Sequence, residues 1–314
     1  MGKKEELVDL HGKVVLITGG NTGIGYATIQ ILARRGAKVY MATRDATKAK
    51  AAIKKMEAEG LGEGSVHFLE LDLSDPRAVS RAAKQFAESE QRLDILINNA
   101  ALGLGPFHLT DDGILDVMVI NHVSPFILTD TLLPLLKRTA AETDSDVRIV
   151  NLSSSMHAQV KPTTFATKET LAKDYGPSAI KQMDTYSYTK LANVLHAKAL
   201  QKRLDSEKSN ITCISIHPGV VHTQTSTSVM GSVPFLGPFL KRVVVPLVFG
   251  TWDAGGKAVA FAAASKDVVA RRSKYKGAYL SVSSLTEPSK QAQDPKLQNE
   301  LYETTEKVVR EMQV

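Results

Sequence analysis

The sequence predicts an α/β fold in which a single doubly wound parallel sheet has helices on both faces. Strand-like and helix-like segments alternate through the first two thirds of the 314-residue chain, and this alternation is typical of βαβ units. Two strand-like segments, VVLIT at 14–18 and DILIN at 94–98, contain continuous apolar runs, as expected where both sheet faces are covered. No linker or internal repeat divides the chain, so we expect one domain over residues 1–314.

The expected elements follow in order along the chain. Strands are short apolar or β-branched runs, and helices are segments whose apolar residues recur every three or four positions, as Ile29, Leu32 and Ala33 do before Gly36 ends the first helix. The predicted strands are Lys13–Thr18, Lys38–Ala42, Val66–Leu71, Leu93–Ile97, Val147–Leu152, Ile211–Ile216 and a weak one near Gly277–Leu280. The predicted helices are Tyr26–Arg35, Ala46–Glu59, Pro76–Glu90, Gly113–Lys137, Asp184–Leu204 and Pro295–Met312. The alternation is lost after about Thr225, so we expect 225–290 to form a substrate-binding region within the same domain.

Composition excludes several classes of protein. Hydrophobic residues make up 43% and charged residues 23% of the chain, which excludes a disordered protein. The formal net charge of +6 favours acidic ligands such as phosphates. The basic residues are scattered without interleaved aromatic side chains, which argues against a nucleic-acid partner. The single cysteine, Cys213, and the lack of an apolar N-terminal signal region predict a reducing, cytoplasmic location.

A glycine-rich loop, Thr18-Gly-Gly-Asn-Thr-Gly-Ile-Gly25, joins the first strand to the first helix. Glycine lets the chain turn tightly and approach a pyrophosphate closely, and a helix start offers free N–H groups to it. The spacing G-x-x-x-G-x-G differs from G-x-G-x-x-G, but the mechanics are the same. The alternative is a glycine-rich turn without a ligand. The flanking strand and helix favour a dinucleotide site.

The end of the second strand indicates which dinucleotide is bound. An NAD site places an acidic residue about 20 positions after the loop to hold the ribose hydroxyls. Here Thr43 stands near that place and Arg44 follows it. A guanidinium suits a 2′-phosphate, and Lys48 lies one turn further on. We therefore predict NADP(H) rather than NAD(H), with Asp45 as the competing acidic candidate and a plain surface charge as the other interpretation of Arg44.

Tyr186-Ser-Tyr-Thr-Lys190 forms a candidate catalytic pair on a helix. Residues four apart share a helix face, and a lysine ammonium beside a tyrosine lowers the phenol pKa from about 10. Such a tyrosine serves as general acid or base in carbonyl chemistry, although the motif alone also fits an ordinary amphipathic helix. Other polar motifs follow the carboxyl ends of neighbouring strands, the edge at which open α/β sheets bind ligands. These are NNAA at 98–101, Asn121, the serines at 153–155 and HPGVVHT at 217–223.

Taken together, these motifs resemble those of the short-chain dehydrogenases/reductases in order and spacing, over roughly Gly12 to Thr223. MATRD, VINHVSPF, YSYTKLANVL and the tail segment EPSKQAQD are most similar to the retinol-dehydrogenase-like branch. The resemblance implies a Rossmann-type sheet of about seven strands. It also implies an NADP(H)-dependent oxidoreductase that interconverts an alcohol and a ketone or aldehyde on a lipophilic, retinoid-, steroid- or polyketide-like substrate.

The resemblance further implies a role for each matching residue. Tyr186 is the general acid in reduction, and Lys190 lowers its pKa and holds the nicotinamide ribose. Ser154 orients the carbonyl, and Asn121 positions a water in the proton relay. The implied catalytic residues are Asn121, Ser154, Tyr186 and Lys190. The implied cofactor-binding residues are Gly19, Asn21, Thr22, Gly23, Ile24, Gly25, Arg44, Lys48, Asp72, Leu73, Asn99, Ala100, Asn121, Tyr186, Lys190, Val221 and Thr223.

Among the cofactor residues, the resemblance places Asp72 on the adenine and Asn99 in the cofactor cleft. The main chain of Val221 and the side chain of Thr223 meet the carboxamide and phosphate side. No metal site is expected, because His217 and His222 flank a Pro-Gly turn without cysteine or acidic partners.

Three positions depart from the family pattern. Ala101 replaces the usual glycine of N-N-A-G. Ser154 and Tyr186 are 32 positions apart, a longer gap than usual, so we expect the insert Met156–Asp184 to form a loop beside the active site. Serines also flank Ser154 on both sides, so its assignment rests on the family motif.

The segment SVPFLGPFLKRVVVPLVF at 232–249 is apolar but interrupted by proline, glycine and basic residues. It is too short and broken to span a membrane. We favour a hydrophobic lid over the substrate, and the alternative is an interfacial patch that makes peripheral membrane contact. Two other functions stay open, a ketoreductase of secondary-metabolite biosynthesis and a catalytically silent NADP-binding regulatory protein. The sequence also leaves open the exact substrate, the physiological direction and whether the chain forms a homo-oligomer.

Overall fold

The structure is a computed structural model that describes residues 6–219 and 251–314. Its sheet has eight strands in the order β3-β2-β1-β4-β5-β6-β7-β8. The strands are β1 Val14–Thr18, β2 Lys38–Thr43, β3 Ser65–Glu70, β4 Ile95–Asn98, β5 Val147–Leu152, β6 Ile211–His217, β7 Tyr279–Ser281 and β8 Ser284–Thr286. Strands β1 to β7 are parallel, and β8 pairs antiparallel with β7. The predicted doubly wound sheet is confirmed, with one strand more than the seven expected.

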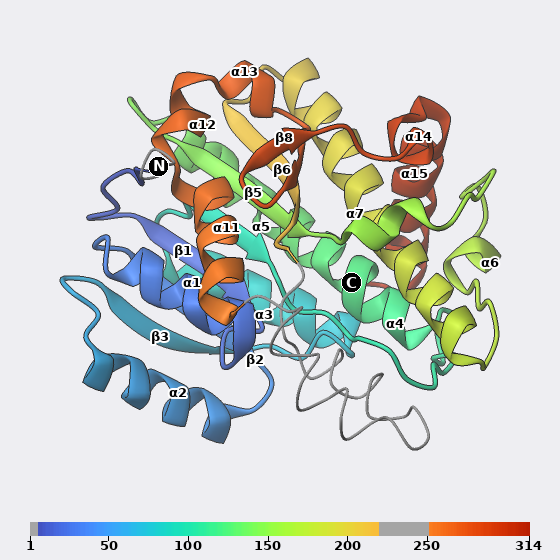
Figure 1. Cartoon of the computed structure of the whole chain (residues 1–314), viewed down its shortest axis with the longest axis horizontal. Helices are drawn as coiled ribbons and strands as arrows, with labels where there is room; N and C mark the ends of the chain where they lie inside the picture. The colour runs from blue at the N-terminus through green and yellow to red at the C-terminus, as the bar shows by residue number, and fades with distance from the viewer. Residues whose placement is uncertain (1–5, 220–250) are drawn as a thin grey trace.

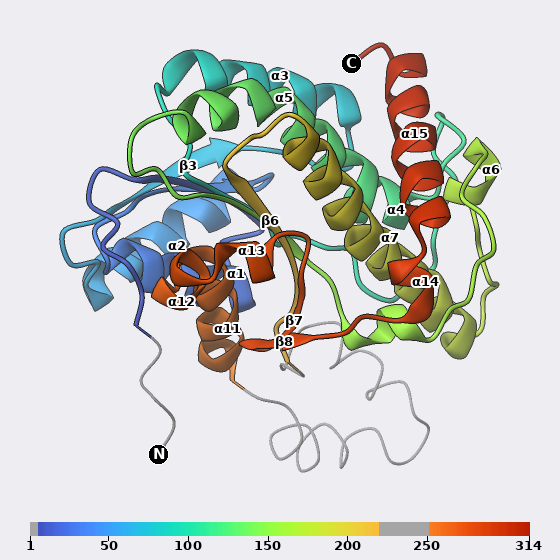
Figure 2. The ribbon, with the colours of Figure 1, turned by 90° about the horizontal axis from the view of Figure 1, so that it is seen from above.

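Helices cover both faces of this sheet (Figures 1 and 2). The helices are α1 Gly23–Ala33, α2 Ala46–Glu59, α3 Pro76–Ser89, α4 Asp116–Met118, α5 Ser124–Ala140, α6 Lys168–Leu171, α7 Ala179–Ser206, α11 Trp252–Ala264, α12 Lys266–Ala270, α13 Arg272–Tyr275, α14 Lys290–Gln293 and α15 Pro295–Glu311. A π-helical turn, η1 Val119–Val123, joins α4 to α5, and a 3-10 turn, η2 Ser155–Ala158, follows β5.

The two faces of the sheet carry separate cores because side chains alternate along each strand. Val15 and Ile17 of β1 pack with residues of α1, α2 and α11. Val14 and Leu16 pack with residues of α3, α5 and α7 on the opposite face. All five residues of β1 are buried, which explains the continuous apolar run in its sequence.

Helix α11 was not predicted, and it lies inside the 225–290 segment. It packs against α1 so closely that a Cβ on Gly256 would lie 2.6 Å from Ala27 Cβ. The buried guanidinium of Arg148 in β5 donates to the carbonyl of Ala262 at 3.1 Å and to that of Ser265 at 2.9 Å, which satisfies exposed carbonyls at the helix end. Residues 252–264 therefore belong to the helical layer that covers the sheet. The substrate-binding region stays a prediction for the rest of 225–290.

The insert Met156–Asp184 is only partly the loop that the sequence predicted, at 159–167 and 172–178. It contains most of η2, the whole of α6 and the first residues of α7. Helix α7 begins at Ala179, five positions before the expected start, because the Ser178 side chain accepts a hydrogen bond from the Lys181 N–H and caps it.

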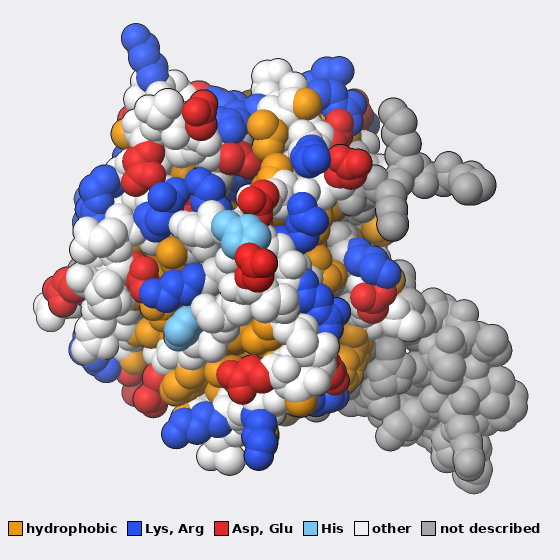
Figure 3. All heavy atoms as spheres, turned by 90° about the vertical axis from the view of Figure 1, so that its left-hand side faces the viewer, with side chains coloured by type: hydrophobic (Ala, Val, Ile, Leu, Met, Phe, Trp, Pro, Cys, Tyr) orange, Lys and Arg blue, Asp and Glu red, His pale blue; other side chains and the backbone are white. Residues whose placement is uncertain are grey.

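The stretch Asp116–Ala140 is long and apolar enough to cross a membrane by length and composition. However, 72% of its most apolar window is buried inside the protein, so core packing accounts for its composition. On the face drawn in Figure 3, basic and acidic side chains are interspersed.

Candidate active site

The order of the strands reverses between β1 and β4, and a cavity of about 190 Å³ lies at that edge. Ligands of open α/β sheets bind at such a switch point. The cavity is lined by Gly19, Ala42, Thr43, Arg44, Leu71, Asp72, Leu73, Ser74, Ala100, Ala101, Leu102 and Ile120. It brings together five of the predicted cofactor residues from four different segments: Gly19, Arg44, Asp72, Leu73 and Ala100.

The glycine loop has the backbone that a phosphate cradle requires. Gly19 and Gly23 have φ of +71° and +63°, a region that other residues rarely adopt. A Cβ on Gly25 would lie 2.4 Å from the Gly19 carbonyl oxygen, so only glycine lets the helix start approach the loop. Thr22 precedes α1 in an extended conformation, and its side chain does not cap the helix. The first-turn N–H groups therefore remain available for an anion, which fits a pyrophosphate.

Hydrogen bonds from Asn99 hold this loop in place. Its Nδ2 donates to the carbonyl oxygens of Thr18 at 2.7 Å and Gly19 at 3.1 Å. The main-chain N–H groups of Asn99 and Ala100 both donate to Thr18 Oγ1 at 3.0 Å. The amide of Asn99 thus holds the glycine loop in place, a different arrangement from a side chain that faces the cofactor cleft.

The end of β2 separates the two candidates for coenzyme selection. The Asp45 carboxylate caps α2 by accepting the Lys48 N–H at 2.9 Å, and the Lys48 ammonium lies 3.3 Å from it. Among the residues that the structure describes, no carboxylate forms an ion pair with the exposed Arg44. Thr43 Oγ1 donates to Asn21 Oδ1 at 3.4 Å, which links β2 to the glycine loop. Arg44 is therefore free to meet an anion, whereas Asp45 and Lys48 are bound to each other.

Asp72, which follows the neighbouring strand β3, also lines the cavity. Its Oδ1 accepts hydrogen bonds from the N–H of Ser74 at 2.9 Å and the hydroxyl of Ser74 at 2.7 Å. These bonds fix one carboxylate oxygen, and no described residue donates a hydrogen bond to the other. Leu73, buried next to it, completes this wall.

Helix α7 carries Tyr186 and Lys190 on one face. The Lys190 ammonium lies 5.4 Å from the centroid of the Tyr186 ring and donates to the Leu152 carbonyl at 3.3 Å. Asn193 Nδ2 donates to the same carbonyl at 2.9 Å. Lys190 is 3% exposed, and none of the described carboxylates pairs with it, so its charge stands almost alone at the carboxyl end of β5.

Burial shifts the pKa values of this pair in opposite directions. Loss of solvent raises the pKa of Tyr186 to about 12 and lowers the pKa of Lys190 to about 8. The sequence predicted a Tyr186 pKa below 10, but in this structure desolvation outweighs the lysine, which does not form a hydrogen bond with the phenol. Tyr186 is consequently protonated, and Lys190 is mostly cationic, at neutral pH.

The serines at the end of β5 differ in their surroundings. Ser153 is 5% exposed and its hydroxyl donates to the Lys190 carbonyl at 2.7 Å. Ser154 is partly exposed, and its Oγ accepts the Met156 N–H at 3.2 Å. The proton of Ser154 is thus available to a ligand while that of Ser153 is committed to the protein.

His157 fixes the main chain of Ser154, a role that sequence reasoning missed. The Ser289 N–H donates to His157 Nε2 at 3.0 Å, so Nδ1 carries the ring proton and donates it to the Ser154 carbonyl at 2.7 Å. Burial lowers the pKa of His157, which keeps this neutral tautomer. The only signal in the sequence was a histidine three positions after the serine.

Asn121 lies in the π-helical turn η1 and is 1% exposed. Its Oδ1 accepts the Leu102 N–H at 2.7 Å, and its Nδ2 donates to the Leu102 carbonyl and to Thr189 Oγ1, both at 3.0 Å. Thr189 stands one residue before Lys190 on α7. Asn121 therefore joins η1, the segment after β4 and the catalytic helix, and Thr189 is a second contact that the motifs did not reveal.

Some predicted residues lie outside the described part of the chain. These are Val221, Thr223, His222 and the 232–249 segment. His217, at the end of β6, is partly buried, and burial lowers its pKa. Among residues 6–219 and 251–314, no cluster of three or more histidine, cysteine, aspartate or glutamate side chains could hold a metal ion.

Comparison with known proteins adds independent information. The sequence model of the short chain dehydrogenase family matches residues 13–167. A short-chain dehydrogenase/reductase of Armillaria gallica is 41% identical over 312 residues, which cover 99% of this chain and 97% of that protein. A crystal structure of an uncharacterized protein from Mycobacterium paratuberculosis superposes with a TM-score of 0.72 at 29% identity, covering 97% of this chain and 96% of that one. The RhlG/NADP active-site complex of Pseudomonas aeruginosa superposes with a TM-score of 0.65 at 26% identity, covering 87% and 96%.

Proposed function

The chain belongs to the short-chain dehydrogenase family, and on that premise we propose that it is an NADP(H)-dependent enzyme that interconverts an alcohol with a ketone or aldehyde on a lipophilic substrate. Its family makes it an oxidoreductase that uses a nicotinamide cofactor. The observation that carries the finer proposal is the placement of Tyr186 and the nearly isolated ammonium of Lys190 at the carboxyl end of β5. That sheet edge also holds the cleft lined by Gly19 and Arg44.

The described residues fit an NADP(H) molecule. The uncapped first turn of α1 would hold the pyrophosphate, Asp72 the adenine, Arg44 the 2′-phosphate and Lys190 the nicotinamide ribose. The RhlG structure is named as an NADP complex, which supports this choice for a chain of the same fold. When bound, the cofactor supplies or accepts the hydride. Val221 and Thr223, which lie outside the described residues, stay proposed contacts of the carboxamide and phosphate side.

The chain's own residues would manage the proton and the carbonyl. In reduction, the Tyr186 hydroxyl donates its proton to the carbonyl oxygen of the substrate, and a pKa of about 12 keeps that proton in place at neutral pH. The Ser154 hydroxyl donates a hydrogen bond to the same oxygen and orients it. The Lys190 cation stabilises the phenolate that forms. Asn121 donates both amide protons to protein partners. A relay water would therefore donate a hydrogen bond to the remaining lone pair of Asn121 Oδ1 or to the main-chain carbonyl of Asn121.

The composition of 232–249 supports a lipophilic substrate. This segment offers Phe235 and Phe239 among many aliphatic residues, and burying one such side chain against a ligand is worth about 1.5–3 kcal/mol. Phe235→Ala or Phe239→Ala should raise KM for a polycyclic or long-chain carbonyl by about tenfold and leave a small ketone unchanged. An equal response of both substrates would favour the alternative, in which the segment makes peripheral membrane contact. The proposal places the enzyme in the cytoplasm and leaves homo-oligomers open.

A turnover assay tests the proposal. Purified protein should oxidise NADPH in the presence of apolar ketones or aldehydes, and the Tyr186→Phe variant should not. Turnover restricted to charged or sugar-like carbonyls would refute the lipophilic substrate. A reaction with a polyketide-like ketone alone would favour the ketoreductase alternative. Cofactor binding without turnover on any carbonyl would favour the silent regulatory protein, although the presence of Asn121, Ser154, Tyr186 and Lys190 argues against it.

A further inference from the structure

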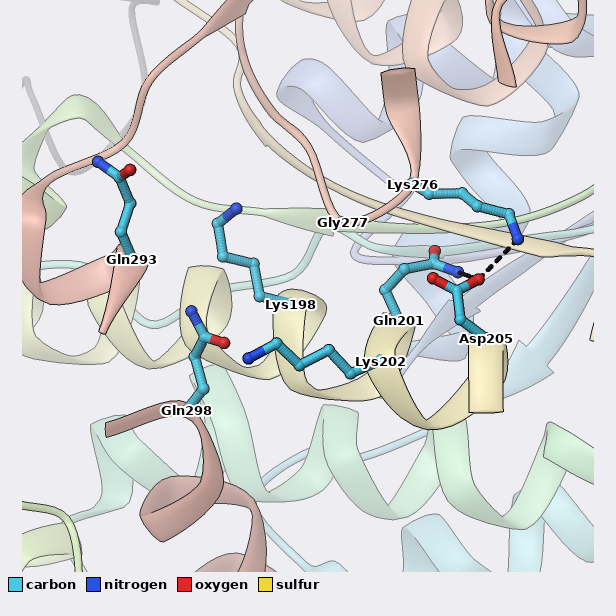
Figure 4. Close-up of a pocket in the computed structure, with 8 residues that line it drawn as sticks. All are labelled: Lys198, Gln201, Lys202, Asp205, Lys276, Gly277, Gln293 and Gln298. Atoms are coloured by element: carbon cyan, nitrogen blue, oxygen red, sulfur yellow. Dashed lines mark hydrogen bonds and ion pairs between the residues drawn. The ribbon is translucent and has the colours of Figure 1, made fainter. Parts of the chain in front are cut away.

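A second cavity, of about 300 Å³, opens beside the C-terminal half of α7 (Figure 4). It is lined by Lys198, Gln201, Lys202, Asp205, Lys276, Gly277, Gln293 and Gln298. It shares no lining residue with the cofactor cleft. Lys198 follows the catalytic Lys190 by eight residues, or about 12 Å along the helix, so the two sites lie on one rigid element.

One side of this cavity is rigid and electrically neutral. The Lys276 ammonium pairs with the Asp205 carboxylate at 2.6 Å, and Gln201 Nε2 donates to the same carboxylate at 3.0 Å. Gln201 is 3% exposed, and its Oε1 accepts the Cys213 N–H at 2.7 Å. The Asp205 charge is therefore already balanced and does not offset the other lysines.

Two lysines on the other side have no such partner. Lys198 and Lys202 are four residues apart, so they project from one face of α7, and like charges at this spacing repel. No carboxylate among the described residues pairs with either one. Burial and the Lys202 charge together lower the pKa of Lys198. Figure 4 shows the Lys202 side chain extending toward Gln298, whereas Lys198 points away from Gln298 and Lys276 turns toward Asp205.

A buried acceptor completes the lining. Gln298 is 2% exposed, and its Nε2 donates to the Ala292 carbonyl at 2.9 Å. Its Oε1 is buried, and none of the residues that the structure describes donates a hydrogen bond to it. Such an orphaned group is costly to leave unpaired. Figure 4 shows this oxygen on the side of the amide that faces Lys202. Among the described residues, the lining of the cavity thus holds two lysines without a carboxylate partner and, next to Lys202, a buried acceptor without a donor.

We propose that this cavity binds a small dianion that also carries a hydroxyl group, such as a hydroxydicarboxylate or a phosphate monoester. The Lys198 and Lys202 ammoniums would hold the negative charges, and the hydroxyl would donate to Gln298 Oε1. This inference does not depend on the proposed function, because it uses neither the cofactor cleft nor the catalytic residues.

Isothermal titration calorimetry on the full chain at low ionic strength tests the site. The probes are L-malate and glycerol 3-phosphate, which separate carboxylate from phosphate ligands, with succinate lacking the hydroxyl and glycerol lacking the charge. Each titration is run both without and with saturating NADPH, which occupies the cofactor cleft. We expect binding of at least one dianion and none of glycerol.

Matched variants locate the binding. Lys198→Ala/Lys202→Ala should weaken it by about tenfold or more, because the double substitution removes both cations that would contact the ligand. The control Lys54→Ala/Lys307→Ala removes the same charge from exposed positions on α2 and α15 and should leave affinity unchanged. Gln298→Leu should abolish any preference for malate over succinate.

Three results would overturn the proposal. The first is that neither dianion binds at millimolar concentration. The second is that the control pair weakens binding as much as the pair in the cavity, which would indicate a general charge effect. The third is that binding disappears when NADPH is added, which would place the anion in the cofactor cleft.

Discussion

Replacing Lys190 by methionine should stabilise the protein while abolishing its proposed chemistry. Lys190 is 3% exposed, and among the described residues its ammonium makes a single hydrogen bond, to the Leu152 carbonyl. Asn193 also donates to that carbonyl, so the substitution leaves no orphaned acceptor. Methionine occupies nearly the volume of the lysine stem without its charge.

The magnitude follows from the pKa of Lys190. Burial lowers it from 10.5 to about 8, and at about 1.4 kcal/mol per pH unit the buried cation costs about 3 kcal/mol at pH 7. Because the folded-state pKa lies below the unfolded-state value, the unfolded chain holds the proton more tightly between about pH 8 and 10.5. Wild-type stability therefore gains from this group as pH rises through that window, and the advantage of the variant should fall to about 1.5 kcal/mol near pH 9.5.

Urea unfolding of the cofactor-free protein at both pH values measures this difference. The exposed Lys202 on the same helix supplies the control, since Lys202→Met should change the free energy of unfolding by less than about 0.5 kcal/mol. A Lys190→Met variant that is less stable than wild type at pH 7 would refute the reasoning. An advantage that does not change with pH would also refute it, because the gain would then come from packing and not from the charge.

Three further predictions concern coenzyme choice, positioning and acid stability. Arg44→Ala should raise KM for NADPH by about 10- to 150-fold and leave KM for NADH nearly unchanged, and equal use of both coenzymes by the wild type would refute the role of Arg44. His157→Phe removes the hydrogen bond to the Ser154 carbonyl and should lower kcat by about tenfold or more with KM for NADPH unchanged. Partial recovery of kcat in His157→Gln would separate positioning from packing. An unaltered kcat in His157→Phe would contradict the positioning role of His157. His196 is 5% exposed, neither of its ring nitrogens has a hydrogen-bond partner among the described residues, and burial lowers its pKa to about 4. Wild-type stability should therefore fall by up to about 3 kcal/mol as pH drops from about 6.5 through 4. His196→Leu should flatten that loss in an unfolding series against pH, and an unchanged acid limb would assign it to other groups.

The sequence predicted the sheet well because local and tertiary preferences agree there. The bounds of α2 and β5 match the expectation residue for residue, since each has a strong pattern and clear punctuation. Helix α1 begins three residues before its predicted start because Gly23 and Gly25 are poor helix formers and hide the first turn. The three exposed residues of β8 include a single apolar one, Leu285, too few for a strand pattern. They form a strand by pairing with the edge of β7.

The residues of the candidate site also fall into two groups, those that local sequence motifs predict and those that only the fold brings together. Gly19, Arg44, Tyr186 and Lys190 belong to local motifs whose spacing carries the chemistry. The contact of Thr189 with Asn121 spans 68 positions, and that of His157 with Ser289 spans 132. Pairs so distant in sequence leave no periodic trace, so only the fold reveals them. The direction of the Tyr186 pKa shift could likewise not be predicted from the sequence, because it depends on how far Tyr186 and Lys190 are removed from solvent.

Helix α11 shows why the hydrophobic pattern of a sequence can fail to predict a helix. Nine of its residues are buried, so it lacks the polar face that marks an amphipathic helix. Its small residues permit close contact with α1, and the Arg148 guanidinium from β5 satisfies its last carbonyls. Neither cause can be read from residues 252–264 alone.

The central claim is that Tyr186 is the general acid of a carbonyl-reducing enzyme, and Tyr186→Phe tests it most directly. The substitution removes one hydroxyl and keeps the ring beside Lys190, so the fold and the cofactor cleft should remain. The measurement is kcat for NADPH oxidation with an apolar ketone, together with NADPH affinity from fluorescence titration. The account predicts a loss of about 10²- to 10⁴-fold in kcat with NADPH affinity unchanged within about twofold. A kcat near that of the wild type, with the cofactor still bound, would contradict it.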